Sequence, residues 1–323
     1  MGTVIFPPQQ QTPLLNHQCS YCYAARMPIT SPKAHLCNLY MCAGCKVVRY
    51  CSREHQIAHW SRHKPYCLPI KRAKATALAE ERKIKMNPES FRGKNGAQEG
   101  WEAFYMPGDP FEHEIVLWGW DSTRIYMRAR FGLVDALRRI KTTEALQWAL
   151  GHAMRVLQLN RSDALGVRYM VPAMMVRLGN DQEAYDFVKW WAMSGRDKEY
   201  DWGDPHAPYL QLRAEDMLED VVMWTVNEAE LTNQVVVLLV KLKLLVTRQE
   251  RLKFLKGRMS ARESWNAEGD LDGKTVGRGA EVEAGITEVF DSLVRESELL
   301  SAQARDLTAS AVRTTVSNLL QPT

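Results

Sequence analysis

One stretch of the sequence decides the fold of the N-terminal part, namely CAGCKVVRYCSREHQIAHWSRHKPYC at residues 42–67. It contains four cysteines and three histidines. A further Cys-x2-Cys pair, Cys19 and Cys22, precedes it and has the same spacing as Cys42 and Cys45. Two thiolates at this spacing can hold one zinc ion at about 2.3 Å without strain. The pattern therefore favours a metal site.

The distribution of cysteine supports metal over disulfides. All seven cysteines fall between Cys19 and Cys67. Such clustering indicates disulfides in a secreted protein and metal in an intracellular one. Residues 1–16 carry no charge, and prolines and glutamines interrupt any apolar helix there, so no secretory signal is visible. The longest apolar run, 235–240, is far shorter than the ~20 residues that span a bilayer. We therefore expect an intracellular protein, in the nucleus or cytoplasm, with no membrane partner.

The quoted stretch resembles the MYND finger nearly position for position. Members of this family hold two structural zinc ions with interleaved ligands, the first and third pairs on one ion and the second and fourth on the other. The resemblance implies two Zn²⁺ ions in this chain. Its ligand sets would be Cys19, Cys22, Cys51 and His55 for the first zinc, and Cys42, Cys45, His63 and Cys67 for the second.

One ligand departs from the family pattern, because the family usually has cysteine at the position of His55. A neutral imidazole nitrogen can also fill a tetrahedral zinc position, at about 2.0–2.1 Å, so His55 is kept as a ligand. Cys37 and His59 are the alternatives for this place, since Cys37 is unassigned and His59 lies one helical turn beyond His55. Ser52 is expected to cap the short helix that carries His55.

The ligand sets also bear on function. Both predicted sites are closed by four protein ligands, which is typical of structural rather than catalytic zinc. The MYND resemblance implies a protein–protein interaction adapter that takes short proline-containing peptides of partner proteins, including transcriptional regulators. Gln56 and Trp60 match positions that the family uses for peptide binding. We expect no catalytic residues and no enzyme activity.

Two other functions compete with this one. Residues 17–70 carry seven Lys or Arg against Glu54 alone, so a basic finger that binds nucleic acid is an alternative. It is not favoured, because the spacing of a ββα recognition helix is absent. MYND fingers also occur in SET-domain lysine methyltransferases, but this chain lacks the glycine-rich segment before the finger and the Asn-His motif after it. No nucleotide-binding or nucleophile-turn motif occurs either.

The remainder is expected to be mainly α-helical. A face formed by Leu146, Ala149, Leu150, Ala153 and Leu157 predicts a helix from Thr143. A second helix is predicted over 164–178, kinked at Pro172 and stopped by Gly179-Asn180, and Asp181 is expected to cap a third. This helix pair resembles tetratricopeptide-like (TPR-like) units and fungal MYND-containing proteins, which implies an αα-hairpin stack. A long buried helix is predicted over 231–255.

The predicted fold class is a small two-zinc MYND finger followed by an α-helical, αα-hairpin or TPR-like domain. The expected segments are a disordered tail at 1–16, the MYND-type zinc finger at 17–70, a linking helix and loop at 71–100, the α-helical domain with the TPR-like pair at 101–265, and a flexible linker with a C-terminal amphipathic helix at 266–323. We expect that last helix to dock on its own domain.

Overall fold

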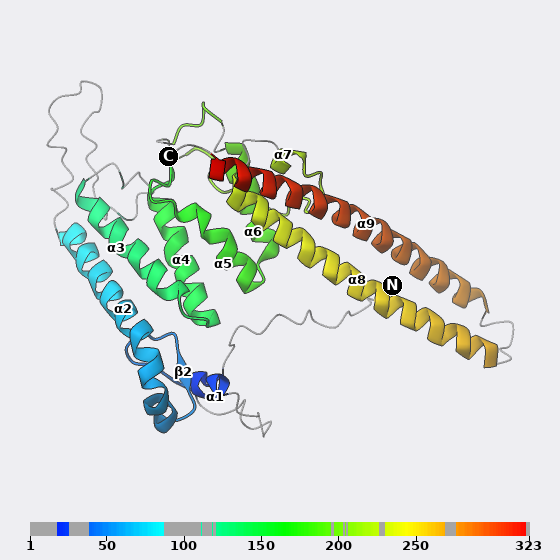
Figure 1. The fold of residues 1–323 in the computed structure, drawn as a ribbon, viewed down its shortest axis with the longest axis horizontal. Helices are drawn as coiled ribbons and strands as arrows, with labels where there is room; N and C mark the ends of the chain where they lie inside the picture. The colour runs from blue at the N-terminus through cyan, green and yellow to red at the C-terminus, as the bar shows by residue number, and fades with distance from the viewer. Residues whose placement is uncertain are drawn as a thin grey trace. The chain divides into compact units, whose positions relative to one another are not determined.

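The structure is a computed structural model that describes residues 18–25, 39–86, 111, 118, 121–194, 197–202, 204, 206–225, 230–268 and 276–320. Within these ranges the chain is mainly helical, with one sheet of two short strands (Figure 1). The expected fold class, a finger followed by helices, is confirmed. The predicted tail at 1–16, the predicted loop at 87–100 and residues 269–275 of the predicted linker lie outside the described residues.

Contacts divide the chain into two units. Unit 1 comprises Met1–Asn180 and Glu199–Tyr209, and unit 2 comprises Asp181–Lys198 and Leu210–Thr323. This division differs from the segments expected from the sequence. The expected boundary after residue 70 falls inside one helix of unit 1, and the boundary after residue 265 falls inside one helix of unit 2.

Unit 1 contains the finger and the helices that pack against it in succession. Its elements are α1 (Ser20–Ala24), β1 (Tyr40–Met41), β2 (Arg49–Tyr50), α2 (Arg53–Met86), α3 (Asp121–Arg138), α4 (Thr143–Leu159), the 3₁₀ helix η4 (Val167–Tyr169) and α5 (Val171–Leu178). The strands are antiparallel, with Tyr40 opposite Tyr50. Helix α2 packs against α3, α3 against α4, and α4 against α5.

Helix α2 is longer than predicted. A short finger helix and a separate linking helix were expected, but a single helix runs from Arg53 to Met86. Pro65 and Pro69 lie inside it and each removes one backbone donor. The helix continues because a buried row that includes Cys67, Ile70 and Ala77 holds both halves against the rest of unit 1.

Helix α4 confirms its prediction, and the segment after it does not. Leu146, Ala149, Ala153 and Leu157 are fully buried on one face of α4. The predicted helix over 164–178 is instead η4 followed by α5, and Pro172 lies in the first turn of α5, where its missing N–H is no loss. The predicted kink is therefore wrong.

The physical reason lies in the turn before η4. The carboxylate of Asp163 accepts hydrogen bonds from the backbone N–H groups of Val167 at 2.8 Å and Arg168 at 2.9 Å. Gly166 adopts a left-handed φ of 69°. These local bonds replace the first turn of the predicted helix. Gly179, with φ 85°, ends α5 as predicted.

Unit 2 is built on a long helical hairpin. Its elements are α6 (Asp181–Ser194), α7 (Val222–Thr225), α8 (Leu231–Glu268) and α9 (Val276–Leu320). Helices α8 and α9 lie side by side (Figure 1) and are antiparallel, since Arg248 pairs with Glu296 and Lys241 with Gln303. The helix predicted over 231–255 is confirmed and extends further. The C-terminal helix docks on its own unit, as expected.

A buried cation ties the loop at 210–221 to this hairpin. Lys241 has no exposed surface, and its Nζ donates to the carbonyls of Met217 and Glu219 and to Oε1 of Gln303, at 2.7–3.0 Å. Nε2 of Gln303 donates to the carbonyl of Leu218 at 3.0 Å. Burial lowers the pKa of Lys241 to about 8, against the opposing field of Glu219. All three donors of the ammonium are therefore satisfied.

Candidate metal centre

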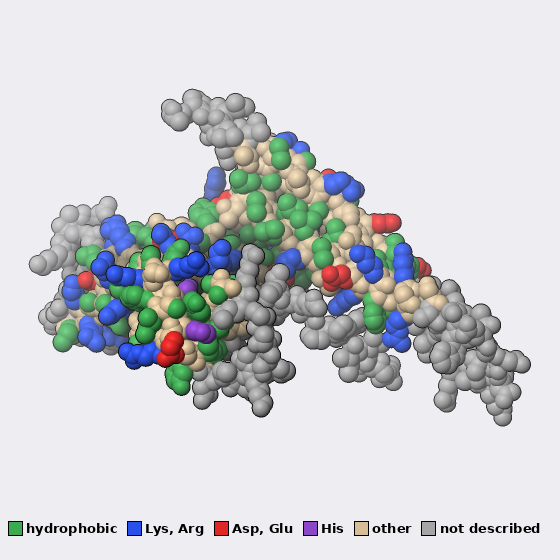
Figure 2. Space-filling view, turned by 60° about the horizontal axis from the view of Figure 1, so that its bottom comes forward, with side chains coloured by type: hydrophobic (Ala, Val, Ile, Leu, Met, Phe, Trp, Pro, Cys, Tyr) green, Lys and Arg blue, Asp and Glu red, His purple; other side chains and the backbone are tan. Residues whose placement is uncertain are grey.

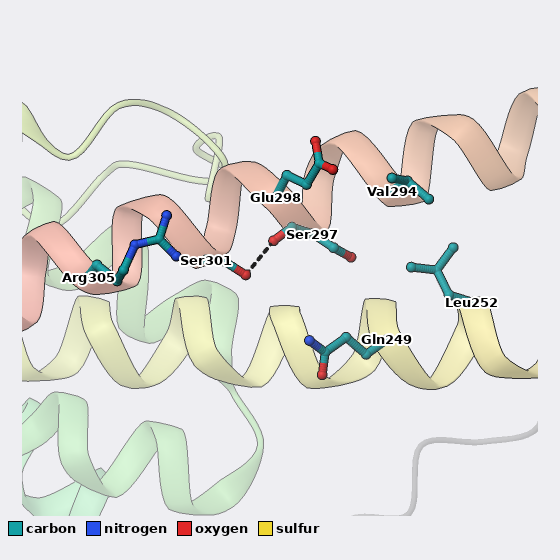
Figure 3. A pocket seen from close by; sticks show the side chains of 7 residues that line it. All are labelled: Gln249, Leu252, Val294, Ser297, Glu298, Ser301 and Arg305. Atoms are coloured by element: carbon teal, nitrogen blue, oxygen red, sulfur yellow. Dashed lines mark hydrogen bonds between the residues drawn. The ribbon is translucent and has the colours of Figure 1, made fainter.

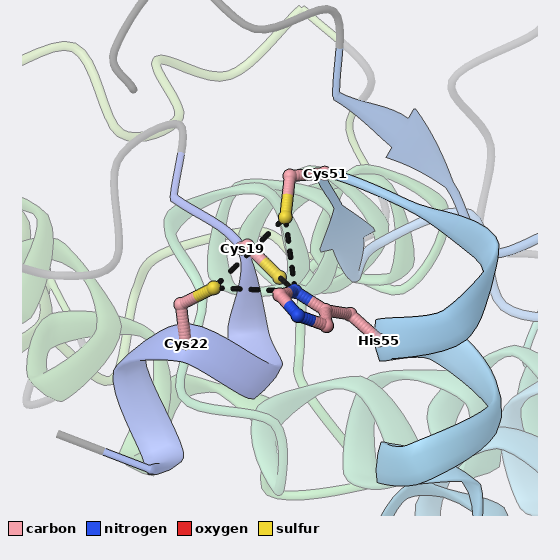
Figure 4. A group of neighbouring side chains, drawn as sticks. All are labelled: Cys19, Cys22, Cys51 and His55. Atoms are coloured by element: carbon pink, nitrogen blue, oxygen red, sulfur yellow. Dashed lines mark hydrogen bonds between the residues drawn. The ribbon is translucent and has the colours of Figure 1, made fainter. Parts of the chain in front are cut away.

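The first cluster joins two separate parts of the finger (Figure 4). Cys19 is the N-cap residue of α1 and Cys22 lies within α1, whereas Cys51 follows β2 and His55 lies in the first turn of α2. Nδ1 of His55 lies 3.0 Å from Sγ of Cys51, 3.3 Å from that of Cys22 and 3.7 Å from that of Cys19. The sulfurs of Cys22 and Cys51 are 3.9 Å apart. The imidazole nitrogen thus faces three thiols, all within 3.7 Å.

The second cluster is fully buried. Cys42 and Cys45 belong to the loop between β1 and β2, while His63 and Cys67 lie one turn apart on α2. Sγ of Cys42 is 3.7 Å from Sγ of Cys67, and Sγ of Cys45 is 3.5 Å from Nε2 of His63. The loop closes as a tight turn in which Lys46 has φ 61° and donates its N–H to the carbonyl of Cys42 at 2.9 Å.

These separations fit two tetrahedral zinc sites. Zinc bonds of about 2.3 Å to sulfur and about 2.0–2.1 Å to nitrogen place two sulfur ligands about 3.8 Å apart, and a sulfur and a nitrogen about 3.6 Å apart. The ligand atoms of each cluster all lie within 4.8 Å of one another. A thiol is only a weak hydrogen-bond donor, so hydrogen bonding alone does not explain why three thiols surround one imidazole. Both predicted ligand sets are therefore brought together, and each fits one zinc ion.

Gly44 shows how closely the second cluster is built. A Cβ atom at this position would lie 2.8 Å from Sγ of Cys67, closer than van der Waals contact allows. The absence of a side chain lets the turn lie directly against the ligand sulfur. Burial acts to raise the pKa of Cys42, but hydrogen bonds that include those from the backbone N–H groups of Cys45 and Gly44 outweigh it, so this pKa is lowered. The turn thus supplies both the space and the donors that a metal thiolate needs.

The electrostatics of the clusters also favour a cation. Burial, and then the positive charge of His59, lower the pKa of His63 to about 4, which keeps its imidazole neutral and able to bind metal. Burial raises the pKa of Cys45 to about 12, and the thiolates of Cys42 and Cys67 add to this rise. Without a cation the thiol of Cys45 keeps its proton at neutral pH, and a divalent ion can replace that proton.

The two alternatives for the place of His55 have different outcomes. Nδ1 of His59 lies 3.1 Å from the hydroxyl of Tyr50, and His59 is not part of either cluster. Cys37 lies outside the described residues. Ser52 caps α2 as expected, since its Oγ accepts the backbone N–H of His55 at 3.3 Å. The structure therefore places His55 with the three thiols.

The finger is fixed to the helices of unit 1 by contacts that the sequence did not predict. Thr142 is the N-cap residue of α4, where its Oγ1 accepts the N–H of Ala145 at 3.2 Å. The same hydroxyl donates to the carbonyl of Val47 in the finger at 2.8 Å. Arg49 and Glu144 form an ion pair beside it, with Nε and Oε1 2.8 Å apart. In each case the partners lie far apart in sequence, so no local pattern could reveal them.

The predicted peptide-binding residues both lie on α2, and Trp60 contacts a residue of the second cluster. The side chain of Trp60 is 39% exposed, and its ring meets the ring of His63 edge-on, with centroids 6.1 Å apart. Gln56 is half-buried one turn earlier. Their role in peptide binding stays a prediction.

Unit 2 has an open pocket of about 380 Å³ between α8 and α9 (Figure 3). Glu298 and Arg305 are the charged residues that line it, and no histidine or cysteine does so. Ser301 donates its hydroxyl to the carbonyl of Ser297 at 2.8 Å.

Comparison with known proteins identifies the finger. Residues 19–67 match the family model of the MYND finger. A search of curated proteins and a search of solved structures each found no match. The chain thus carries a MYND finger with two Cys/His clusters that fit two zinc ions, and a MYND finger is a zinc-dependent protein-interaction module. No helix in the described part of the chain has the length and apolar character to cross a membrane.

Proposed function

We propose that this chain is an adapter that binds other proteins through its finger and catalyses no reaction. We further propose that the finger takes short proline-containing peptides, such as those of transcriptional regulators, in the nucleus or cytoplasm. The observation that carries the proposal is the pair of four-ligand clusters, the second of which includes His63, whose ring contacts the exposed side chain of Trp60. Closed sites leave no coordination position for water or substrate.

The surface of the finger supports peptide recognition. Tyr40 and Met41 of β1 are 64% and 44% exposed, and within the described residues β1 pairs with β2 alone. Such a free strand edge can pair with an extended peptide. Proline-containing segments lose little conformational entropy on binding, because their backbone is already restricted. An exposed tryptophan on the same finger is the kind of anchor that dominates binding energy.

The contact between Trp60 and His63 explains why binding would need zinc. The edge of the indole meets the imidazole that belongs to the second cluster. A bound ion would fix that imidazole and, through it, the position of the indole. Removal of zinc would release both, so the peptide surface would be lost with the metal.

The test compares two tryptophans of equal exposure. Trp60 and Trp148 are each 39% exposed, but Trp148 lies on α4, and its ring contacts the ammonium of Lys74 rather than a ligand residue. Titration with a labelled proline-rich peptide should show a loss of affinity of roughly 10- to 30-fold for Trp60→Ala, as for interface anchors, and little change for Trp148→Ala. Chelation of zinc should abolish binding. Equal behaviour of the two variants, or binding that survives chelation, contradicts the proposal.

Nucleic acid is the second candidate ligand. Residues 39–86 contain eleven Lys or Arg against three Glu, which would attract phosphates without sequence preference. Binding of this kind weakens steeply as salt rises. A SET-like methyltransferase has less support, since the described residues contain a single sheet of two strands.

A further inference from the structure

Helix α2 presents an exposed face that continues beyond the finger. We call it the outer face, and it consists of residues spaced by three or four positions: Ile57, Trp60, Lys64, Leu68, Lys71, Ala75, Leu78 and Arg82. Such spacing places side chains on one side of a helix. All of them are exposed except Leu68, which is half-buried.

The outer face is not the packing face of α2. The buried row of the helix consists of His63, Cys67, Ile70, Ala77 and Ile84, which contact the metal clusters or the core of unit 1. Ile57, Trp60 and Leu78 nevertheless leave 66%, 39% and 45% of their surface to solvent. Scattered apolar residues need no explanation, but a row of them along one helix face is typical of an interaction surface.

The charges on this face all have one sign. Its ionisable residues are Lys64, Lys71 and Arg82, and α2 has no carboxylate between Glu54 and Glu80. None of the three cations has an ion-pair partner within the described part of unit 1, whereas Lys83 and Lys85 pair with carboxylates one turn away. Figure 2 shows blue Lys and Arg side chains interspersed with green hydrophobic ones over the part that contains α1 and α2.

This combination selects among the candidate occupants. A second copy of the chain would bring the same cations face to face, which opposes self-association. A nucleic-acid backbone would use the cations but not the aliphatic side chains of Ile57 and Leu78. A segment that alternates carboxylates with apolar side chains matches both features.

We propose that the outer face of α2 binds an acidic amphipathic segment of a partner protein. The inference deepens the proposed function, because it supplies the chemistry of the partner. It rests on that function only through Trp60, which belongs both to the outer face and to the proposed peptide site. From Trp60 to Arg82 the face is about 33 Å long at about 1.5 Å per residue. The part from Leu68 to Arg82 lies beyond the residues that match the MYND finger.

The test uses the full zinc-loaded chain and three labelled probes. The first is a helical peptide of about twenty residues with glutamates along one edge of a leucine face, long enough to follow the outer face. The second is an uncharged proline-rich peptide, and the third is a single-stranded RNA of comparable length. Anisotropy titrations at low and at physiological salt give the affinity for each probe.

The variants change the outer face downstream of the finger. Lys71→Glu should lower the affinity for the acidic peptide by roughly 5- to 10-fold, since it replaces attraction by repulsion. Leu78→Ser should lower this affinity by roughly 3-fold. The control is Arg72→Glu, which makes the same charge change on the same helix about 100° away from Lys71 and should alter affinity less than about 2-fold. Binding of the proline-rich peptide should be unchanged in all three. Circular dichroism and zinc content show whether each variant is folded.

Several results overturn the inference. The acidic peptide could fail to bind, or Arg72→Glu could weaken it as much as Lys71→Glu does, which would indicate unspecific attraction to a basic helix. RNA that binds more tightly than the peptide, with a steep salt dependence, would assign the face to nucleic acid. A failure of the proposed function has a different signature: the proline-rich peptide then does not bind, while the effect of Lys71→Glu on the acidic peptide persists.

Discussion

Replacement of Gly44 by alanine tests the geometry of the second zinc cluster. The new Cβ would lie 2.8 Å from Sγ of Cys67. This is about 0.7 Å short of an ordinary contact of about 3.5 Å. Metal–ligand distances in a well-formed site stay within about 0.2 Å of their ideal values. The sulfur must therefore move by roughly three times that tolerance, or the turn must open.

We expect Gly44→Ala to lower zinc affinity at the second site by roughly 10- to 100-fold, the range seen when groups that support a metal ligand are disturbed. This corresponds to about 1.4–2.8 kcal/mol. Competition with a chromogenic chelator measures the affinity of each of the two ions, and the weaker one should be that of the second cluster. The first cluster, which does not contact Gly44, should be unchanged.

The chain supplies a matched control in Gly151. A Cβ at this position, inside α4, would meet no atom within 4 Å. Gly151→Ala should therefore leave zinc affinity unchanged and stabilise unit 1 by about 0.5–1 kcal/mol, since alanine is the better helix former. Two zinc ions held by Gly44→Ala as tightly as by the unaltered chain would refute the assignment of Cys67 as a ligand packed against this turn.

Three further predictions concern the surrounding structure. Thr142→Val should destabilise unit 1 by roughly 1–2 kcal/mol in urea unfolding, because it removes both the cap of α4 and the bond to Val47; no change would show that the finger is held by other contacts. Burial, and then nearby cations, lower the pKa of His152 to about 4, so the unfolded chain binds the extra proton and stability falls as pH drops below about 6.5. The free energy of unfolding should therefore fall less between pH 7.5 and pH 5.5 in His152→Gln than in the unaltered chain. Since this side chain is partly exposed, the difference should be only about 1 kcal/mol. An equal fall in both proteins would contradict the burial of a neutral imidazole. Lys241→Met should cost unit 2 roughly 2–4 kcal/mol by leaving the carbonyl of Met217 unpaired, with unit 1 unaffected in hydrogen exchange.

The sequence was most informative where chemistry dictates spacing. The eight residues that form the two clusters were predicted from the Cys-x2-Cys pairs and the family resemblance, because metal bonds tolerate few arrangements. His55 was the open position, and its Nδ1 lies among the three thiols. The resemblance of the helices after α3 to a TPR-like pair stays a prediction.

The sequence was least informative where distant contacts compete with local rules. A short finger helix and a separate linking helix were expected, but burial of Cys67 and Ile70 keeps α2 continuous through Pro65 and Pro69. Pro172 suggested a kink within one helix. Instead, the side chain of Asp163 bonds the backbone N–H of Val167, and a new helix begins just before Pro172. The contact between Thr142 and Val47 joins segments that no window of the sequence contains together. The continuity of α2 and this contact depend on tertiary packing rather than on propensity.

The continuity of α2 has a consequence for how this protein can vary. Two predicted zinc ligands, His63 and Cys67, lie on the same helix as Ala77 and Ile84, which pack it against the core of unit 1. One residue inserted between Cys67 and Ala77 would turn everything beyond it by about 100° and shift it by about 1.5 Å. The zinc ligands and the core residues of α2 could then no longer both face their partners. Insertions or deletions between Cys67 and Ala77 should therefore be poorly tolerated, because the finger and the core of unit 1 share one helix.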